Sequence, residues 1–183
     1  MSGGEKVKMS KRSGKIVEMG ELAGDVGKDA ARYFFLKRSM ESHLDFDVEL
    51  AKKHTDENPV YYVQYAHARI CNIVKFAAEK GAKHPDKVEV KFELISSPEE
   101  RVLMRKIMDF PEVLSASAEK LEVHWLPHYL EELAAVFHRF YTEHRVVSED
   151  PAMTSARLCL CEAVRRVLLR GLSIMGVSAP ESM

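Results

Sequence analysis

Cysteines and long apolar runs are both scarce in this chain, and their scarcity excludes several classes of protein. Three cysteines among 183 residues are too few and too unevenly spaced for a disulfide framework. No apolar run approaches the roughly 20 residues that a membrane helix needs, and the first residues lack the apolar segment of a secretion signal. We therefore expect a cytoplasmic protein, in a reducing compartment and without a membrane partner.

The middle of the chain lacks an excess of positive charge, and such an excess is found only at the two ends. Residues 1–38 contain nine Lys or Arg against five Asp or Glu, and residues 151–183 contain four against two, whereas residues 39–150 contain fourteen against twenty-one. The formal net charge is only −1, which argues against indiscriminate binding to nucleic acid. Basic patches at the ends remain compatible with one specific, positioned contact.

Strand patterns are also rare, and helical periodicity dominates the chain. Residues 15–27 indicate the end of a strand followed by a short helix with two glycine breaks, and residues 87–95 alternate in a way typical of either an edge strand or an extended connector. The sequence therefore predicts an all-α fold, an antiparallel helical bundle preceded by a basic loop and short connecting helices. Helices are expected over 28–39, from Asp47 within 43–54, and over 58–81, 97–110, 110–123, 127–145 and 151–176.

Two of the expected helices carry clear start signals. Asn58 can cap a helix that has Pro59 in its first position, and Ser97 precedes Pro98 in the same way, followed by acidic residues that suit the positive first turn. The apolar stripe of the first of these helices comprises Val63, Ala66, Ile70, Ile73, Val74 and Ala77, and that of the last helix comprises Ala156, Leu160, Ala163, Val167 and Leu168.

A basic, glycine-flanked loop lies near the start of the chain. Four basic side chains surround Met9 and Ser10, which is typical of a mobile loop that binds phosphate, although a lysine-rich solvated tail would have the same composition. The stretch Lys8-Met9-Ser10-Lys11 resembles the second signature of class I aminoacyl-tRNA synthetases. The residues that follow it, 29–70, and the last helix with its terminal methionine, 155–183, resemble the corresponding parts of arginyl-tRNA synthetases.

The resemblance implies that Lys8, Met9, Ser10 and Lys11 bind ATP. It also implies a catalytic role for the two lysines, Lys8 and Lys11. Ammonium groups on such a loop can stabilise the charge that accumulates on the triphosphate during amino-acid activation. The first signature of the class, a His-x-Gly-His type motif, is absent from the sequence, and so is a parallel βαβ pattern. We therefore expect ATP with Mg²⁺ to serve the complete enzyme, and no cofactor to be held by this chain alone.

An aromatic helix follows at residues 61–69. Tyr62, Tyr65 and Arg69 lie within one turn of each other, so they can stack on bases and contact phosphate, although an aromatic core stripe is the favoured alternative for Tyr61 or Tyr65. In the family this helix belongs to the anticodon-binding DALR domain. The resemblance implies that Tyr62, Tyr141 and Met183 enclose an anticodon base. Tyr65, which can stack, and Arg69 and Lys75, which can contact phosphate, complete the predicted tRNA-binding set. Ser155-Ala156-Arg157-Leu158 stands in place of the namesake Asp-Ala-Leu-Arg motif.

The remaining candidates favour structural roles. His124 and His128 have the spacing of a helical zinc pair, but Pro127 intervenes and no third ligand is nearby, so we expect surface or partly packed histidines and no metal site. Cys159 and Cys161 are expected in the core, on different faces of a helix.

Together these patterns predict two units: residues 1–55 as the loop and the helical connector to a catalytic domain, and residues 56–183 as the anticodon-binding bundle. The expected function is that of the C-terminal part of an arginine-tRNA ligase, inactive by itself, whose partners are arginine tRNA and the missing catalytic domain. The alternatives are a stand-alone RNA-binding module without catalysis and a helical interaction protein with no RNA role.

Overall fold

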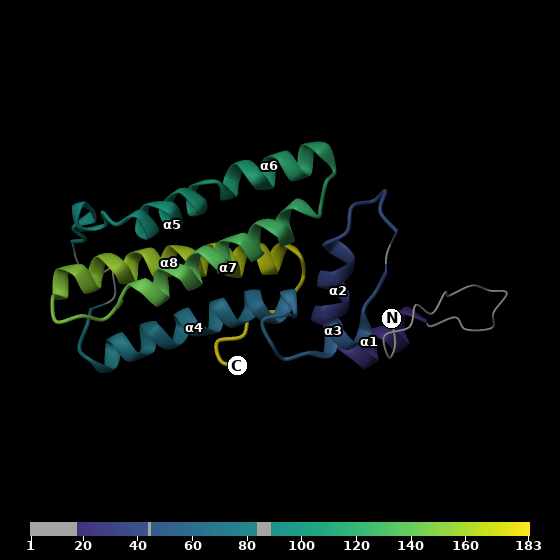
Figure 1. Ribbon diagram of the computed structural model, residues 1–183, viewed down its shortest axis with the longest axis horizontal. Helices are drawn as coiled ribbons and strands as arrows, with labels where there is room; N and C mark the ends of the chain where they lie inside the picture. The colour runs from purple at the N-terminus through teal and green to yellow at the C-terminus, as the bar shows by residue number, and fades with distance from the viewer. Residues whose placement is uncertain (1–17, 44, 84–88) are drawn as a thin grey trace.

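The computed structural model describes residues 18–43, 45–83 and 89–183, and within these ranges it contains helices and no strand (Figure 1). The basic loop Lys8, Met9, Ser10 and Lys11 lies outside the described residues. Three short helices come first, and five longer ones make up the bundle. They are α1 (Met19–Val26), α2 (Lys28–Leu36), α3 (Val48–Lys52), α4 (Pro59–Glu79), α5 (Pro98–Met108), α6 (Phe110–Lys120), α7 (Trp125–Glu143) and α8 (Pro151–Ile174).

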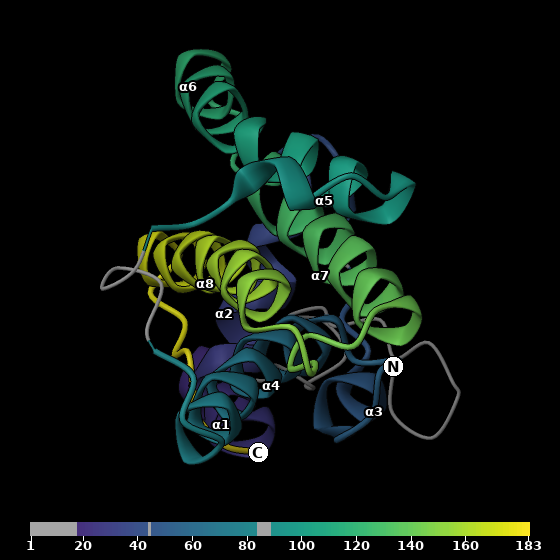
Figure 2. The same cartoon turned by 90° about the vertical axis from the view of Figure 1, so that its left-hand side faces the viewer.

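The helix α7 is central to the bundle and packs against α4, α5, α6 and α8. Seen end-on, α4, α8, α7 and α5 surround a common interior, and α6 projects from the top (Figure 2). Both α7 and α4 run antiparallel to α8, whereas α4 and α7 run in the same direction because α5 and α6 bring the chain back between them (Figure 1). The all-α bundle is confirmed, and this parallel pair is what places residues of α4 beside residues of α7.

The predicted helix starts are confirmed by their capping contacts. The side chain of Asn58 accepts a hydrogen bond from the backbone N–H of Val60 and also donates to the carbonyls of Ala51 and Lys53. Ser97 and Glu100 form a reciprocal capping box at the start of α5. These caps fix where α4 and α5 begin, since the side-chain oxygens satisfy N–H groups that have no partner inside a helix.

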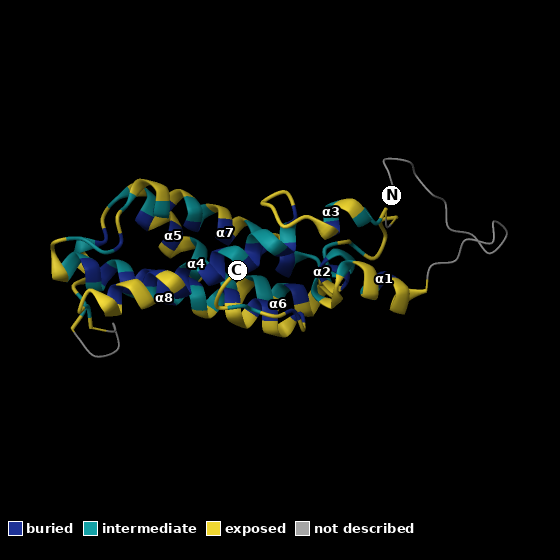
Figure 3. Ribbon diagram, turned by 90° about the horizontal axis from the view of Figure 1, so that it is seen from below, coloured by how far each residue is buried: buried dark blue, intermediate teal, exposed yellow. Residues whose placement is uncertain are grey.

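The core lies between α4, α7 and α8, where the buried faces of the three helices meet (Figure 3). The predicted stripe of α4 is buried except at Val74, which is half-buried. The predicted stripe of α8 is buried except at Ala163 and Val167, which are half-buried, and Val167 still packs against the core. Because α8 packs against both α4 and α7, its buried face also includes Cys161, Val164 and Leu172, with 0 % exposure each.

Two connecting segments differ in detail from their sequence patterns. The glycines Gly20 and Gly24 lie inside α1 rather than breaking it. Both are exposed, and no other described part of the structure lies close to them. In the segment 87–95 the described residues, from Glu89 on, form no strand, and Phe92–Leu94 form a 3-10 turn. This part of the segment is therefore a connector, which leads into the capping box of α5.

Candidate nucleic-acid interface

A cleft of about 660 Å³ opens between α4 and the C-terminal end of α7. Its volume lies within the range of small-molecule sites. It is lined by aromatic, basic and small apolar side chains from three parts of the chain: Tyr65, Ala68, Arg69, Asn72, Ile73 and Phe76 from α4, Tyr141 to Val147 except Glu143 from α7 and its following turn, and Met183.

Arg69 lies between two tyrosine rings of this cleft. Its guanidinium carbon is 4.7 Å from the centroid of the Tyr141 ring and 5.1 Å from that of Tyr65. A cation over two ring faces is held by the negative charge of the π systems, and a planar guanidinium leaves its N–H edge available to oxygen atoms. The cleft therefore has aromatic rings on which a base can stack, and beside them a guanidinium that can bind phosphate.

A second cleft, of about 510 Å³, adjoins the first one and shares Tyr65 and Arg69 with it. Its other lining residues are Asp56, Tyr61, Tyr62 and His138. The rings of Tyr61 and Tyr65 stack nearly parallel at 6.2 Å, with an interplanar angle of 7°. Both tyrosines are half-buried, so the alternative that either belongs to the core is wrong.

The predicted tRNA-binding residues thus divide between the two clefts. Tyr141 and Met183 line the first cleft, while Tyr62 lines the second, where its ring centroid is 4.9 Å from that of His138. Burial, followed by the charge of Asp56, raises the pKa of Tyr62, so its hydroxyl remains a hydrogen-bond donor at neutral pH.

Lys75 lies outside both clefts. It is exposed, and its ammonium pairs with Glu181 at 3.5 Å. An exposed pair of this kind is weak, so a phosphate can compete with the carboxylate for Lys75.

His138 is a cleft residue that the sequence analysis missed. It is half-buried beside Tyr62 and Tyr65, and its Nε2 atom is buried without a hydrogen-bond partner. Burial, together with the nearby charge of Arg69, lowers the pKa of His138 to about 4, so the ring is neutral at pH 7. Its position one helical turn before Tyr141 was the available signal, because residues at i and i+3 share a helix face.

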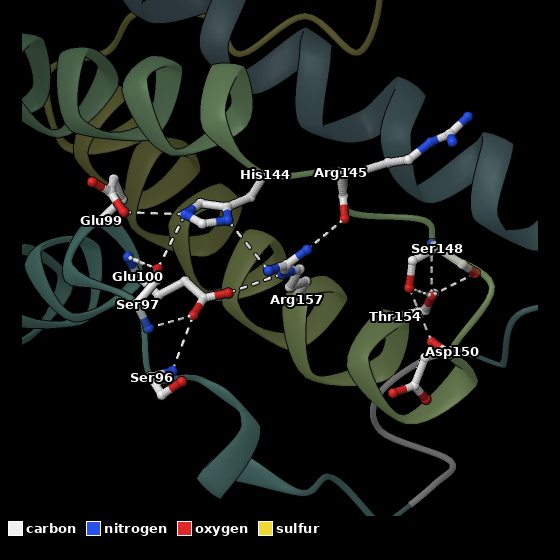
Figure 4. A network of polar contacts seen from close by, with 10 residues as sticks. All are labelled: Ser96, Ser97, Glu99, Glu100, His144, Arg145, Ser148, Asp150, Thr154 and Arg157. Carbon is white, nitrogen blue, oxygen red and sulfur yellow. Dashed lines mark hydrogen bonds and ion pairs between the residues drawn. The ribbon is translucent and has the colours of Figure 1, made fainter.

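Arg145 was missed as well, and a polar network presents it to the first cleft (Figure 4). Arg157 donates to the carboxylate of Glu100 at 2.9 Å, to the carbonyl of Arg145 at 2.8 Å and to Nδ1 of His144 at 3.3 Å. Since Nδ1 accepts, His144 carries its proton on Nε2, which lies 3.2 Å from Glu99. The turn after α7 is therefore held by its backbone, and the Arg145 side chain extends away from the network toward α4 (Figure 4).

Glu100 is the buried charge of this network, with 1 % exposure. Burial by itself would raise the pKa of Glu100, but hydrogen bonds from Ser97 and from Arg157 outweigh it and lower the pKa. The carboxylate also accepts a hydrogen bond from the backbone N–H of Ser96 at 3.0 Å. The carboxylate is consequently ionised and fully paired at neutral pH, as a buried charge must be.

Nothing in the described part of the chain gathers three or more His, Cys, Asp or Glu side chains into a group that could hold a metal ion. His124 is half-buried and His128 exposed, which confirms their assignment as surface or partly packed histidines. Cys161 is in the core, while Cys159 is only half-buried. Of the described helices, none has both the length and the apolar character that a membrane crossing demands.

Aromatic rings beside a cationic side chain form the kind of surface on which proteins stack unpaired bases of single-stranded RNA. The chain belongs to the DALR anticodon-binding domain family, whose model matches residues 63–183. The family predicted from the sequence is therefore confirmed, despite the altered namesake motif.

The similar proteins are arginine-tRNA ligases. The chain is 47 % identical over all 183 residues to the one from Desulforamulus reducens and 49 % identical over 180 residues to the one from Symbiobacterium thermophilum, covering 33 % and 32 % of their lengths. It thus spans about a third of these relatives.

Two solved structures show the same fold. A structure described as an arginyl-tRNA synthetase from Campylobacter jejuni matches 99 % of this chain and 38 % of its own, with a TM-score of 0.82 at 33 % identity. The arginyl-tRNA synthetase of Thermus thermophilus matches 94 % of this chain and 29 % of its own, with a TM-score of 0.73 at 28 % identity.

Proposed function

We propose that this chain is the tRNA-binding part of an arginine-tRNA ligase and that its two adjoining clefts hold the anticodon loop. The observation that carries the proposal is the placement of Arg69 between Tyr65 and Tyr141, on a domain of the anticodon-binding family. A base in the first cleft stacks on Tyr141 and is covered by Met183, and a neighbouring base stacks on Tyr62 in the second cleft. Arg69 and Lys75 contact the phosphates, and Tyr65 separates the two bases.

Specificity should rest on one position of the loop. Arginine codons vary in their first and third letters, so a domain that serves all arginine tRNAs has to hold the middle anticodon base and tolerate the others. Titration of the chain with anticodon stem-loops that differ only at the middle base tests this. Tighter binding of the stem-loop with the arginine middle base supports the proposal, and equal binding of all stem-loops contradicts it.

The second part of the proposal concerns activation of arginine. By the family resemblance, residues 1–55 include the loop in which Lys8 and Lys11, with Met9 and Ser10, bind the triphosphate of ATP, and residues 56–183 are the anticodon-binding unit. In the complete enzyme Mg²⁺ accompanies ATP. The proposed compartment is the cytoplasm.

The isolated chain should be inactive, since the loop cannot orient ATP without a nucleotide-binding sheet. Arginine-dependent pyrophosphate exchange by the purified chain is the test, with a complete arginine-tRNA ligase as positive control. Exchange above background would contradict this part. Both a synthetase fragment and a stand-alone RNA-binding module would bind the stem-loop without catalysing exchange, so this result does not distinguish them. Restored exchange on addition of the catalytic portion supports the fragment, and its continued absence supports the stand-alone module.

A further inference from the structure

The residues that follow α8 are tied to two other helices rather than left free. Residues 178–183, here called the strap, leave the end of α8 and cross α4 (Figure 1). The strap starts from Val177, which is buried in the core with 4 % exposure. Met183, at its far end, is 49 % exposed and lines the first cleft.

The first tie is centred on Asp29 of α2. One of its carboxylate oxygens, Oδ2, accepts hydrogen bonds from Nε2 of Gln64 at 2.9 Å, from the backbone N–H of Ser178 at 3.2 Å and from the Ser178 hydroxyl. The second hydrogen on Nε2 of Gln64 serves the carbonyl of Ser178 at 3.0 Å. Hydrogen bonds to an ionised acceptor are stronger than neutral ones, so this tie joins α2, α4 and the strap firmly.

Two further contacts hold the strap along α4. Nδ1 of His67 donates to the carbonyl of Pro180 at 2.9 Å, and Lys75 pairs with Glu181. His67 is 1 % exposed, and burial lowers its pKa, so the ring is neutral and carries its proton on Nδ1 at pH 7. Of the two contacts, the buried hydrogen bond is the stronger constraint, because the Lys75 pair is exposed.

These ties restrict where Met183 can lie. A fully extended chain spans about 3.3–3.6 Å per residue, so three residues beyond Pro180 allow Met183 a radius of about 10 Å, whereas six residues beyond Val177 allow about 20 Å. Losing the contacts at Ser178, Pro180 and Glu181 together would therefore enlarge the volume open to Met183 by about eightfold, which is the upper limit for any one of them. A flexible side chain that is already confined beside its site loses less freedom on binding.

We infer that Asp29 and Gln64 are positioning residues, which hold the strap so that Met183 lies ready at the first cleft. They do not touch the base. The inference rests on the proposed function, because it takes the anticodon base as the ligand that Met183 covers. It adds that a residue of α2, outside the clefts, controls the affinity for that base.

A double-mutant cycle on the 183-residue chain tests the inference. Asp29→Ala frees the strap at Ser178 but leaves the contact between His67 and Pro180, so it should weaken stem-loop binding by about 2- to 4-fold, less than the limit set by losing every tie. In a Met183→Ala background the same change should have no further effect, because no side chain is left to position. Losses that multiply in the double variant would overturn the inference, since they would show that Asp29 acts on binding by another route.

Two single variants separate positioning from general damage to the fold. Asp29→Asn keeps a carbonyl oxygen that accepts from Gln64 and Ser178, and it should retain most of the affinity. Asp25→Ala removes an exposed carboxylate of α1 that pairs with Lys52 at 3.7 Å, and it should leave binding unchanged. Binding is compared at a temperature at which circular dichroism shows each variant to be folded. An Asp25→Ala loss equal to that of Asp29→Ala would overturn the inference.

A measurement without RNA distinguishes failure of the inference from failure of the proposed function. The methyl resonances of methionine, labelled with carbon-13, report the mobility of Met183, and Met183→Ala identifies its signal. Asp29→Ala should make this methyl group more mobile. Unchanged mobility overturns the inference whatever the RNA result. If instead the wild type binds no stem-loop while its Met183 methyl depends on Asp29, the strap is held as described and the proposed function fails.

Discussion

The guanidinium of Arg69 lies 4.7 Å from the centre of the Tyr141 ring and so joins α4 to α7 in the lining of the first cleft. The contact depends on the parallel course of the two helices, which sets residues 62 and 69 of α4 beside residues 138 and 141 of α7. It fixes an aromatic face and a cation at neighbouring points of one surface. Stacking and phosphate binding can therefore be separated by substitution.

Replacing Tyr141 with Ala should weaken binding of the anticodon stem-loop by about 5- to 150-fold, because stacking on an aromatic ring contributes about 1–3 kcal/mol per base. Tyr62→Ala should cause a loss in the same range, through the second cleft. Titration at one fixed salt concentration measures both. Tyr141→Phe is the matched control and should bind nearly as tightly as the wild type. Alanine variants with wild-type affinity would show that these rings have no ligand-binding role.

Replacing Lys75 with Ala should weaken binding of all stem-loops by a similar factor and leave the preference among them intact. The lysine is exposed and lies outside the clefts, and its exposed pair with Glu181 is too weak to hold the strap, so its main role is to neutralise phosphate charge. The slope of log affinity against log salt should become shallower by about 0.7 for one lost contact to a single strand. Lys120→Ala, on α6, is the control and should keep the wild-type slope. A changed base preference with an unchanged slope would contradict the phosphate role.

Replacing Arg157 with Ala should lower the free energy of unfolding by about 3–5 kcal/mol, because Glu100 is then left buried without its positively charged partner. The additional change Glu100→Gln should recover part of this loss, since a neutral amide costs less to bury than a carboxylate. Urea unfolding at neutral pH measures the three variants. If the double variant is less stable than Arg157→Ala, the buried charge is not the source of the loss.

Lowering the pH from 7 to 4 should destabilise the chain in part through His138. Its pKa is about 4 in the folded chain and about 6.5 when unfolded, so the unfolded state takes up the proton first. The stabilisation is complete above pH 6.5, falls as the pH decreases and is lost below pH 4. The buried His67, whose pKa is also lowered, acts in the same direction.

The His138 effect is separable by substitution. Urea unfolding at pH 7 and at pH 5 should show a smaller difference for His138→Gln than for the wild type. Glu100 does not interfere with this comparison. Its pKa is lowered in the folded chain, so the stabilisation it provides is lost only below about pH 4.3, the ordinary pKa of a glutamate. An equal difference in the variant and the wild type would contradict the assignment.

The sequence could predict most helices, because their signals are local. Asn58 with Pro59 and Ser97 with Pro98 mark two helix starts, and the capping hydrogen bonds span only a few residues. The break between α5 and α6 is local as well. Pro111, near the start of α6, lacks an N–H and its ring clashes with the carbonyl four residues earlier.

The buried face of α8 and the residues of the second cleft could not be predicted in the same way. Periodicity shows that a helix has an apolar side, but which residues of a broad apolar arc are covered depends on how many neighbours pack there. Val167 is apolar and half-buried, whereas Cys161 is fully buried, because α8 lies against both α4 and α7. For His138 the sequence offered only its position one helical turn before Tyr141.

By itself the sequence determined the helical class, the caps and the family, since each of these is written in neighbouring residues or in a stretch that resembles known proteins. Only the tertiary structure decided that Tyr62 and Tyr141 line different clefts, that Arg69 lies between two rings, and that Asp29 holds the strap through Ser178. Asp29 and Ser178 are separated by 149 positions in the chain. No local pattern specifies such a contact, because it results from the packing of α2, α4 and α8 around one core.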